Sequence, residues 1–385
     1  MNALMRVSVP SLLLAAALAS AQSSAPVSPG ANEWTWMGGS STVAPANPVQ
    51  PGVYGTLGTP AAGNIPTGRY SASSWTDSSG NFWLFGGQLV DSQSGAAQWN
   101  FLNDFWMFNP STNEWVWLGG SSTLPAGPCT SNYCGQPGVY GSLGEFAAGN
   151  APGGRYQAVS STDKNGNFWL FGGFGYDANG ACGELNDLWE FNPSTKQWAW
   201  MGGSSLVPVQ DCTDYVYGQP GVYCTLGTPA GGNVPGGRQG ASSWTDNSGN
   251  FWLFGGFGFD ANDSWAYLND LWEFNPSTKE WAWMGGSSTV VSPGVSQPGV
   301  YGTLGKFAPG NIPGGRGLAA NWTDSSGNLW LFGGEVGGNS SALNLNDLWE
   351  FNPSTKEWAW MDGSGTVDQF GIYGAMGTPA PANVP

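Results

Sequence analysis

The sequence predicts an all-β protein built from repeated four-stranded sheets, and three observations support this. One phrase, "GGRQGASSWTDNSGNFWLFGG" at Gly236 to Gly256, returns in four similar copies. Glycine occurs 62 times and tryptophan 23 times in 385 residues. No helical periodicity of 3.6 residues accompanies them, so the composition favours short strands joined by tight turns.

Two spacings are constant in every copy. The first glycine of an "FGG" doublet always follows the leading arginine by 17 residues, and the Trp of "EW" or "QW" follows the Asp of "LND" by 11. The leading arginines are Arg69, Arg155, Arg238 and Arg316. A period of roughly 80 residues with fixed internal distances indicates one supersecondary unit per copy.

Each unit holds four strands, named a to d in chain order. Strand a follows the arginine, and a turn such as "TDNSGN" leads to the apolar strand b, "FWLFGG". Strand c is "LNDLWEFN", "NPST" is a turn, and strand d is "EWAWMGG". Glu190 and Lys196 flank the c–d turn, where we expect them to be cross-strand neighbours. Such repeated meanders predict a β-propeller, with complete blades at about 69–120, 155–203, 238–286 and 316–363.

These motifs, in fixed order four times over, resemble the kelch repeats of the galactose oxidase and kelch-like superfamily, from Glu33 to about Met361. The resemblance implies a propeller whose blades radiate around a central channel. We expect this propeller over 32–385, with an extra strand d, "NEWTWMGGS", from Asn32 to Ser40. Strands a to c of that blade are missing from the C-terminal end, so we expect a C-terminally truncated chain whose intact form has at least five blades.

The first 21 residues have the pattern of a signal peptide. Arg6 precedes the apolar run Val7 to Ala19, and a small-residue cleavage site ends at Ala21. Residues 22–31 then form a linker. We expect a protein that is secreted, extracellular or periplasmic, with no insertion into the membrane.

Charge and composition exclude several functions. The formal net charge of −16 disfavours nucleic acid as a partner, because binding it needs a positive face. The chain has no histidine, which disfavours the copper site that galactose oxidase would suggest, Ser-His-Asp catalysis and most zinc chemistry. Asp177 and Asp260 lie in loops that offer oxygen ligands for Ca²⁺, but neither loop has EF-hand spacing. We therefore expect no cofactor and no metal.

The five cysteines lie beyond the signal peptide, in a chain bound for an oxidising compartment. Cys129 with Cys134, and Cys212 with Cys224, are spaced to close short loops. That pairing leaves Cys182 over, although a bridge from Cys182 to a neighbouring loop is equally allowed.

The expected binding face is the one with variable loops. The a–b and c–d turns keep their length, whereas the b–c and d–a connections vary and leave the sheet at the same edge. Binding residues concentrate on loops held by a rigid scaffold. Aromatic and acidic side chains there suit sugar stacking, a protein hot spot, or simply packing of the loops themselves. The candidates in the b–c loops are Trp99, Tyr176, Asp177, Phe259, Asp260, Trp265 and Tyr267.

The four arginines allow two interpretations. Their place at the start of strand a puts them near the channel mouth, and arginine binds carboxylates well, so an acidic ligand is conceivable. In some kelch proteins similarly placed arginines face the ligand. Because Arg69, Arg155, Arg238 and Arg316 recur with the scaffold, we favour a structural role, in which each ties loop carbonyls or an Asp together.

We expect a non-catalytic module that binds an extracellular glycan or protein through its long b–c and d–a loops. The alternative is a carbohydrate-active enzyme, an epimerase or a hydrolase, that uses carboxylates at an arginine-lined channel mouth. Some exported kelch propellers epimerise sialic acids, which the resemblance brings into consideration. A third class is a structural adhesin that assembles without a small ligand. The sequence leaves the oligomeric state open.

Overall fold

The computed structural model describes residues 35–42, 51–91, 98–123, 133–208, 217–337 and 343–385. The chain divides into two compact units, Met1–Gly39 and Ser40–Pro385, and every described strand belongs to the second. Residues 35–42 form bends, not the expected extra strand d, because no described strand pairs with their backbone. No helix among the described residues is long and apolar enough to cross a membrane.

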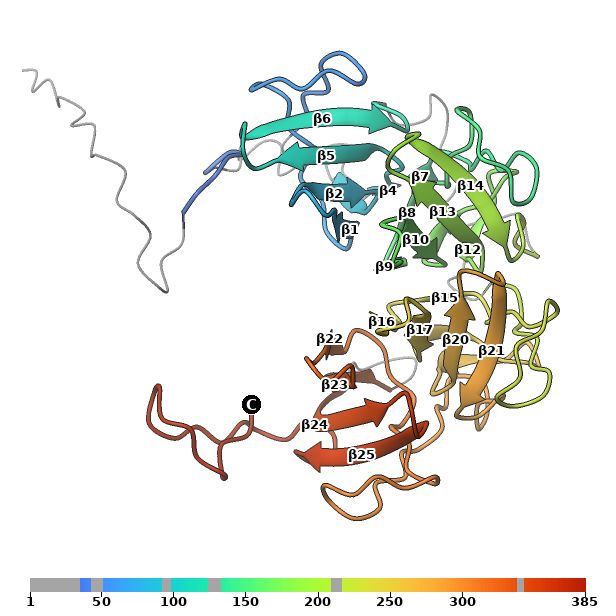
Figure 1. The fold of residues 1–385 in the computed structure, drawn as a ribbon, viewed down its shortest axis with the longest axis vertical. Helices are drawn as coiled ribbons and strands as arrows, with labels where there is room; N and C mark the ends of the chain where they lie inside the picture. The colour runs from blue at the N-terminus through green and yellow to red at the C-terminus, as the bar shows by residue number, and fades with distance from the viewer. Residues whose placement is uncertain (1–34, 43–50, 92–97, 124–132, 209–216, 338–342) are drawn as a thin grey trace, which may run out of the picture. The chain divides into compact units, whose positions relative to one another are not determined.

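Four antiparallel sheets of four strands hold most of the strand residues of the second unit (Figure 1). Each follows the predicted order a, b, c, d. The first two sheets are β1 (Ser73–Thr76), β2 (Phe82–Phe85), β5 (Phe105–Asn109) and β6 (Glu114–Gly119), then β9 (Val159–Thr162), β10 (Phe168–Phe171), β13 (Leu188–Asn192) and β14 (Gln197–Gly202). The third and fourth are β16 (Ser242–Thr245), β17 (Phe251–Phe254), β20 (Leu271–Asn275) and β21 (Glu280–Gly285), then β22 (Ala320–Thr323), β23 (Leu329–Val336), β24 (Leu343–Asn352) and β25 (Glu357–Asp362).

The b–c connections are hairpins that build three smaller sheets. In the second and third repeats the leading arginine and its successor pair with this hairpin, so the predicted strand a is split in two. In the fourth repeat β23 and β24 run on into the hairpin. The small sheets are β3 (Gln88–Asp91), β4 (Gln98–Phe101) and β7 (Tyr133–Gly135); β8 (Arg155–Tyr156), β11 (Phe174–Tyr176) and β12 (Cys182–Glu184); and β15 (Arg238–Gln239), β18 (Phe257–Phe259) and β19 (Trp265–Tyr267).

The glycine doublet allows the next repeat to approach closely. Gly172 and Gly173 have φ of 64° and 90°, a left-handed conformation that favours glycine. A Cβ on Gly172 would lie 2.7 Å from the carbonyl oxygen of Arg238 in the next repeat. The amide of Gly173 donates a hydrogen bond of 2.8 Å to that same oxygen. The doublet is therefore a contact between repeats as well as the end of strand b.

The three largest core clusters each lie between two successive four-stranded sheets. The first strands of successive sheets lie side by side: β1 beside β9, β9 beside β16, and β16 beside β22. Trp189, Trp272 and Trp349 are completely buried, so these recurring tryptophans are core residues.

One predicted side-chain pair is wrong. Lys196 lies within the c–d turn at a φ of 57°, and the partner opposite Glu190 across the strands is Ala199. Burial and the nearby Asp163 raise the pKa of Glu190, and the ammonium of Lys279, from the next repeat, opposes them. The lysine that acts on Glu190 thus comes from the following sheet.

Candidate functional site

Each repeat contains a buried Arg–Asp pair, best described in the second. The guanidinium of Arg155 donates to the two carboxylate oxygens of Asp187 at 2.6 and 2.7 Å. It also donates to the carbonyls of Gly153 and Gly172. Asp187 Oδ2 accepts two further bonds of 2.7 Å, from the hydroxyl of Tyr140 and the indole of Trp189. Burial, together with the charge of Asp187, raises the pKa of Tyr140 well above its ordinary value, so the phenol remains a proton donor.

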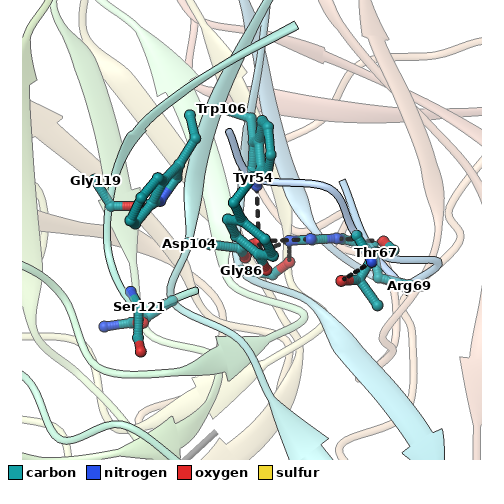
Figure 2. A network of polar contacts seen from close by, with 11 residues as sticks. Tyr54, Thr67, Arg69, Gly86, Asp104, Trp106, Gly119 and Ser121 are labelled. Carbon is teal, nitrogen blue, oxygen red and sulfur yellow. Dashed lines mark hydrogen bonds and ion pairs between the residues drawn. The ribbon is translucent and has the colours of Figure 1, made fainter. Parts of the chain in front are cut away.

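The same network recurs in every repeat. Figure 2 shows it in the first, where the Arg69 guanidinium points at Asp104 beside Tyr54 and Trp106. The two later networks are Arg238–Asp270 with Tyr223 and Trp272, and Arg316–Asp347 with Tyr301 and Trp349. Each arginine is thus held by an aspartate of its own repeat, the arrangement that the structural interpretation of these residues expects.

A cavity of about 300 Å³ lies where the second, third and fourth repeats meet. Its walls combine aromatic rings, amides and backbone. In the sheet β15–β18–β19, Gln239 lies opposite Phe257 and Phe257 opposite Tyr267, so all three side chains share one face. The lining residues are Tyr156, Gln157, Gln239, Gly240, Phe257, Tyr267, Gly317 and Leu318.

Three of the lining residues belong to a row of four in left-handed conformation, which we call the left-handed row: Ser71, Gln157, Gly240 and Leu318. Each stands two positions after a leading arginine, with φ between 52° and 62°. Their backbones are linked between repeats, because Gln157 donates to Ser71 at 3.0 Å, Gly240 to Gln157 at 2.9 Å and Leu318 to Gly240 at 2.8 Å. A second cavity of about 270 Å³ lies over the row and shares Gln157, Gly240 and Leu318 with the first.

Two polar side chains of the lining, Tyr267 and Gln239, have defined hydrogen-bonding states. The Tyr267 hydroxyl donates to Glu335 Oε1 at 2.6 Å. Burial, with the contribution of Glu335, raises the pKa of Tyr267 above its ordinary value, so the phenol keeps its proton. The Oε1 atom of Gln239 is buried without a hydrogen-bond partner among the described residues.

Glu184 is the most unusual acidic side chain in this region. It pairs with Phe174 in its small sheet as Tyr267 pairs with Phe257 in the next, so it occupies the equivalent position. The side chain is wholly buried, and neither carboxyl oxygen has a hydrogen-bond partner among the described residues. Burial raises the pKa of this carboxyl well above its usual value.

Of the aromatic residues proposed from the sequence, only one lines the cavity. Tyr267 lines the cavity, whereas Tyr176 and Phe259 are buried and Trp99 and Trp265 are half-buried on β4 and β19. Sequence reasoning missed Gln157, Gly240 and Leu318. A signal was available, because the position two after each arginine holds a different residue in each repeat.

The two candidate aspartates hold their loops in place. Asp177 Oδ1 accepts from the amides of Asn179 and Ala181, and its Oδ2 accepts from Val207. Asp260 makes the equivalent bonds, to the amides of Asn262, Ser264 and Val290. These carboxylates therefore join each b–c hairpin to the loop that follows strand d.

The cysteines do not all pair as their spacing predicts. Cys134 and Cys182 are each disulfide-bonded. Cys224 is a free, exposed thiol, so the proposed bridge between Cys212 and Cys224 is wrong. Short spacing along the chain did not predict the free state of Cys224. Cys129 and Cys212 lie outside the described residues.

No protein-family model and no curated protein matches this chain. Among solved structures, one titled "Structure of YjhT" aligns with 78% of this chain and 86% of its own, at 18% identity and a TM-score of 0.40. The repeat and the sheets themselves define the architecture. Each four-stranded antiparallel sheet carries the doublet, the buried Arg–Asp pair and the tryptophans at fixed places, and these sheets are consistent with the blades of a kelch-type β-propeller.

Proposed function

We propose that this protein is a non-catalytic binding module that takes up part of a glycan in the 300 Å³ cavity between its second, third and fourth repeats. The observation that carries the proposal is the common face of Gln239, Phe257 and Tyr267, which presents an amide, an apolar ring and a phenol to one space. Such a mixture of aromatic faces and a few placed polar groups is typical of small-ligand sites.

Sugar chemistry fits this lining. The C–H faces of a pyranose ring pack on aromatic side chains, here Tyr156 and Phe257, while hydroxyl groups donate to carboxylate and amide oxygens. The amide of Gln157, which lines the cavity, supplies such an oxygen, and Glu335 accepts the hydrogen bond of the lining residue Tyr267. The volume lies at the lower end of ligand pockets, which suits a terminal sugar unit more than a long chain.

A non-catalytic role is favoured by the state of the titratable groups. A tyrosine whose pKa is raised by burial is a poor general base near neutral pH, and Tyr267 has this property. Glu184 supports the alternative of a carbohydrate-active enzyme, because a buried carboxyl with a raised pKa resembles a general acid. The experiment must therefore distinguish binding from turnover.

The test is a glycan array followed by calorimetry on any sugar retained, with product analysis by mass spectrometry. Phe257→Ala should weaken binding by about tenfold or more, since it removes the stacking ring. Tyr267→Phe keeps the ring and loses the hydroxyl. Phe146→Ala, an exposed aromatic outside the cavity, is the matched control and should leave affinity unchanged. Retention of a glycan that is indifferent to Phe257→Ala would overturn this site, and an altered sugar that Glu184→Gln abolishes would establish the enzyme instead.

A further inference from the structure

The interfaces between sheets follow one pattern. We call the side of a sheet that contacts the preceding sheet its upstream face, and the other side its downstream face. The upstream face of the second sheet presents Phe168, Leu170, Phe191 and Trp198, which pack in one cluster with residues of the first sheet. The third and fourth sheets place equivalent residues in the clusters that precede them. These interfaces are continuous aromatic and aliphatic surfaces.

The first sheet presents the same upstream residue types to solvent. Phe82 stands at the position of Phe168 and Phe251 and is 49% exposed, whereas those two are 0% and 1% exposed. Leu84, Phe108 and Trp115, the rest of this face, are only partly buried, although their counterparts in the other three sheets are almost fully buried.

The fourth sheet has an uncovered downstream face. Trp322 is 44% exposed, while Trp75 and Trp244, at the same position in the first and third sheets, are 5% and 4% exposed. Trp330, Phe332 and Leu348 are partly exposed as well, although the equivalent residues of the three earlier sheets are buried.

The buried counterparts of Trp322 show what this residue does in an interface. The indole of Trp75 donates to the carbonyl of Ser161 at 3.0 Å, in the next sheet. The indole of Trp244 donates at 3.0 Å to the carbonyl of Trp330, again across the interface. Trp322 therefore carries both the apolar surface and the donor that join one sheet to the following one.

We propose that the uncovered downstream face of the fourth sheet docks on the uncovered upstream face of the first sheet in a second copy of this chain. The chain carries both halves of an interface that it already forms three times internally, so a second copy supplies a matching surface without any new chemistry. The contact joins two different faces and is heterologous, so it closes into a ring or continues as an open assembly, depending on the rotation between copies. Apolar patches of this kind on a monomer are a liability unless covered.

The experiment measures the mass of the full chain by light scattering and sedimentation velocity across a range of concentrations. The expected result is a concentration-dependent multimer. Trp322→Asp and Phe82→Asp should each abolish self-association, because a carboxylate placed in an apolar interface is strongly unfavourable. Phe307→Asp, at an exposed aromatic in another loop, is the control and should assemble like the unaltered protein. Circular dichroism and urea unfolding must show that all three variants fold.

Mixing the two variants gives the decisive observation. Trp322→Asp keeps an intact upstream face and Phe82→Asp an intact downstream face, so a 1:1 mixture should form a dimer that neither forms alone. A strictly monomeric unaltered chain would overturn the proposal. So would a longer natural polypeptide that is monomeric and shields Phe82 and Trp322 with sheets of its own, and so would a mixture that stays monomeric.

Discussion

Arg155 and Asp187 are joined by two parallel hydrogen bonds of 2.6 and 2.7 Å, with both side chains almost completely buried. They are 32 residues apart in the sequence and link the start of strand a to strand c. Removing one partner of such a pair leaves an uncompensated charge away from water, and this costs more than the intact pair contributes.

Asp187→Asn should lower the free energy of unfolding by about 3–5 kcal/mol, measured by urea denaturation. The substitution keeps the shape of the side chain but leaves the Arg155 charge without its counterion. Asp263→Asn, at an exposed turn position, is the control and should change stability by less than about 0.5 kcal/mol. Equal effects of the two substitutions would contradict the role assigned to the pair.

Gly172→Ala should be more destabilising than Gly166→Ala. Both glycines have positive φ, of 64° and 84°, so both substitutions carry the same conformational penalty of about 1–2 kcal/mol. Only at Gly172 would the new Cβ also meet the backbone of the next repeat, whereas nothing lies within 4 Å of a Cβ at Gly166. Thermal unfolding of the two variants compares the effects directly, and similar losses would argue against a close contact between repeats at the doublet.

Glu184 should make the protein less stable as the pH rises. Because burial raises its pKa in the folded state, the folded protein holds this proton more tightly than the unfolded chain does. Stability is therefore complete below the ordinary value near 4.5 and declines as the pH climbs from there toward the folded-state pKa.

Glu184→Gln should remove this decline and leave the protein more stable than the unaltered chain at neutral pH. Urea denaturation at several pH values between 4 and 8 gives the two profiles. Glu145→Gln, at an exposed glutamate, controls for the change in net charge. Parallel profiles for Glu184→Gln and the unaltered protein would show that this carboxyl is not desolvated.

Cys224 should react with a maleimide in the folded, unreduced protein, because its thiol is free and exposed. Cys134 and Cys182 should be labelled only after reduction. Peptide mass spectrometry locates the label, and Cys224→Ser should lose the fast reaction. If Cys224 reacted only after a reductant was added, the disulfide with Cys212 that the spacing predicted would be supported instead.

The order of the strands was predictable because local turns set it. In the a–b turn of the third repeat, Asp246 accepts from the amides of Ser248 and Asn250 and from the indole of Trp252, all within six residues. Turns of this kind can be recognised from the sequence because all their partners are close along the chain. The Glu190–Lys196 pairing failed because the lysine that acts on Glu190 belongs to another repeat, and no local pattern reports contacts between repeats.

The candidate site was harder to predict for the same reason. Tyr267 was identified as a residue that differs between repeats, but the cavity also needs Gln157 and Leu318 from two other repeats. Their backbones are left-handed even though neither is a glycine, and neither glutamine nor leucine indicates that conformation in a sequence. A role that depends on three separated segments becomes visible only when they are assembled.

The left-handed row also separates the chemistry of the two cavities from the stability of the fold. Its four residues, Ser71, Gln157, Gly240 and Leu318, have side chains of different chemistry. The backbone hydrogen bonds that link each of them to the next are nevertheless all formed. Because main-chain atoms do the joining, the side chains there can be exchanged one repeat at a time. A designer who wished to alter the lining of the two cavities would begin at these positions and leave the doublets and tryptophans untouched.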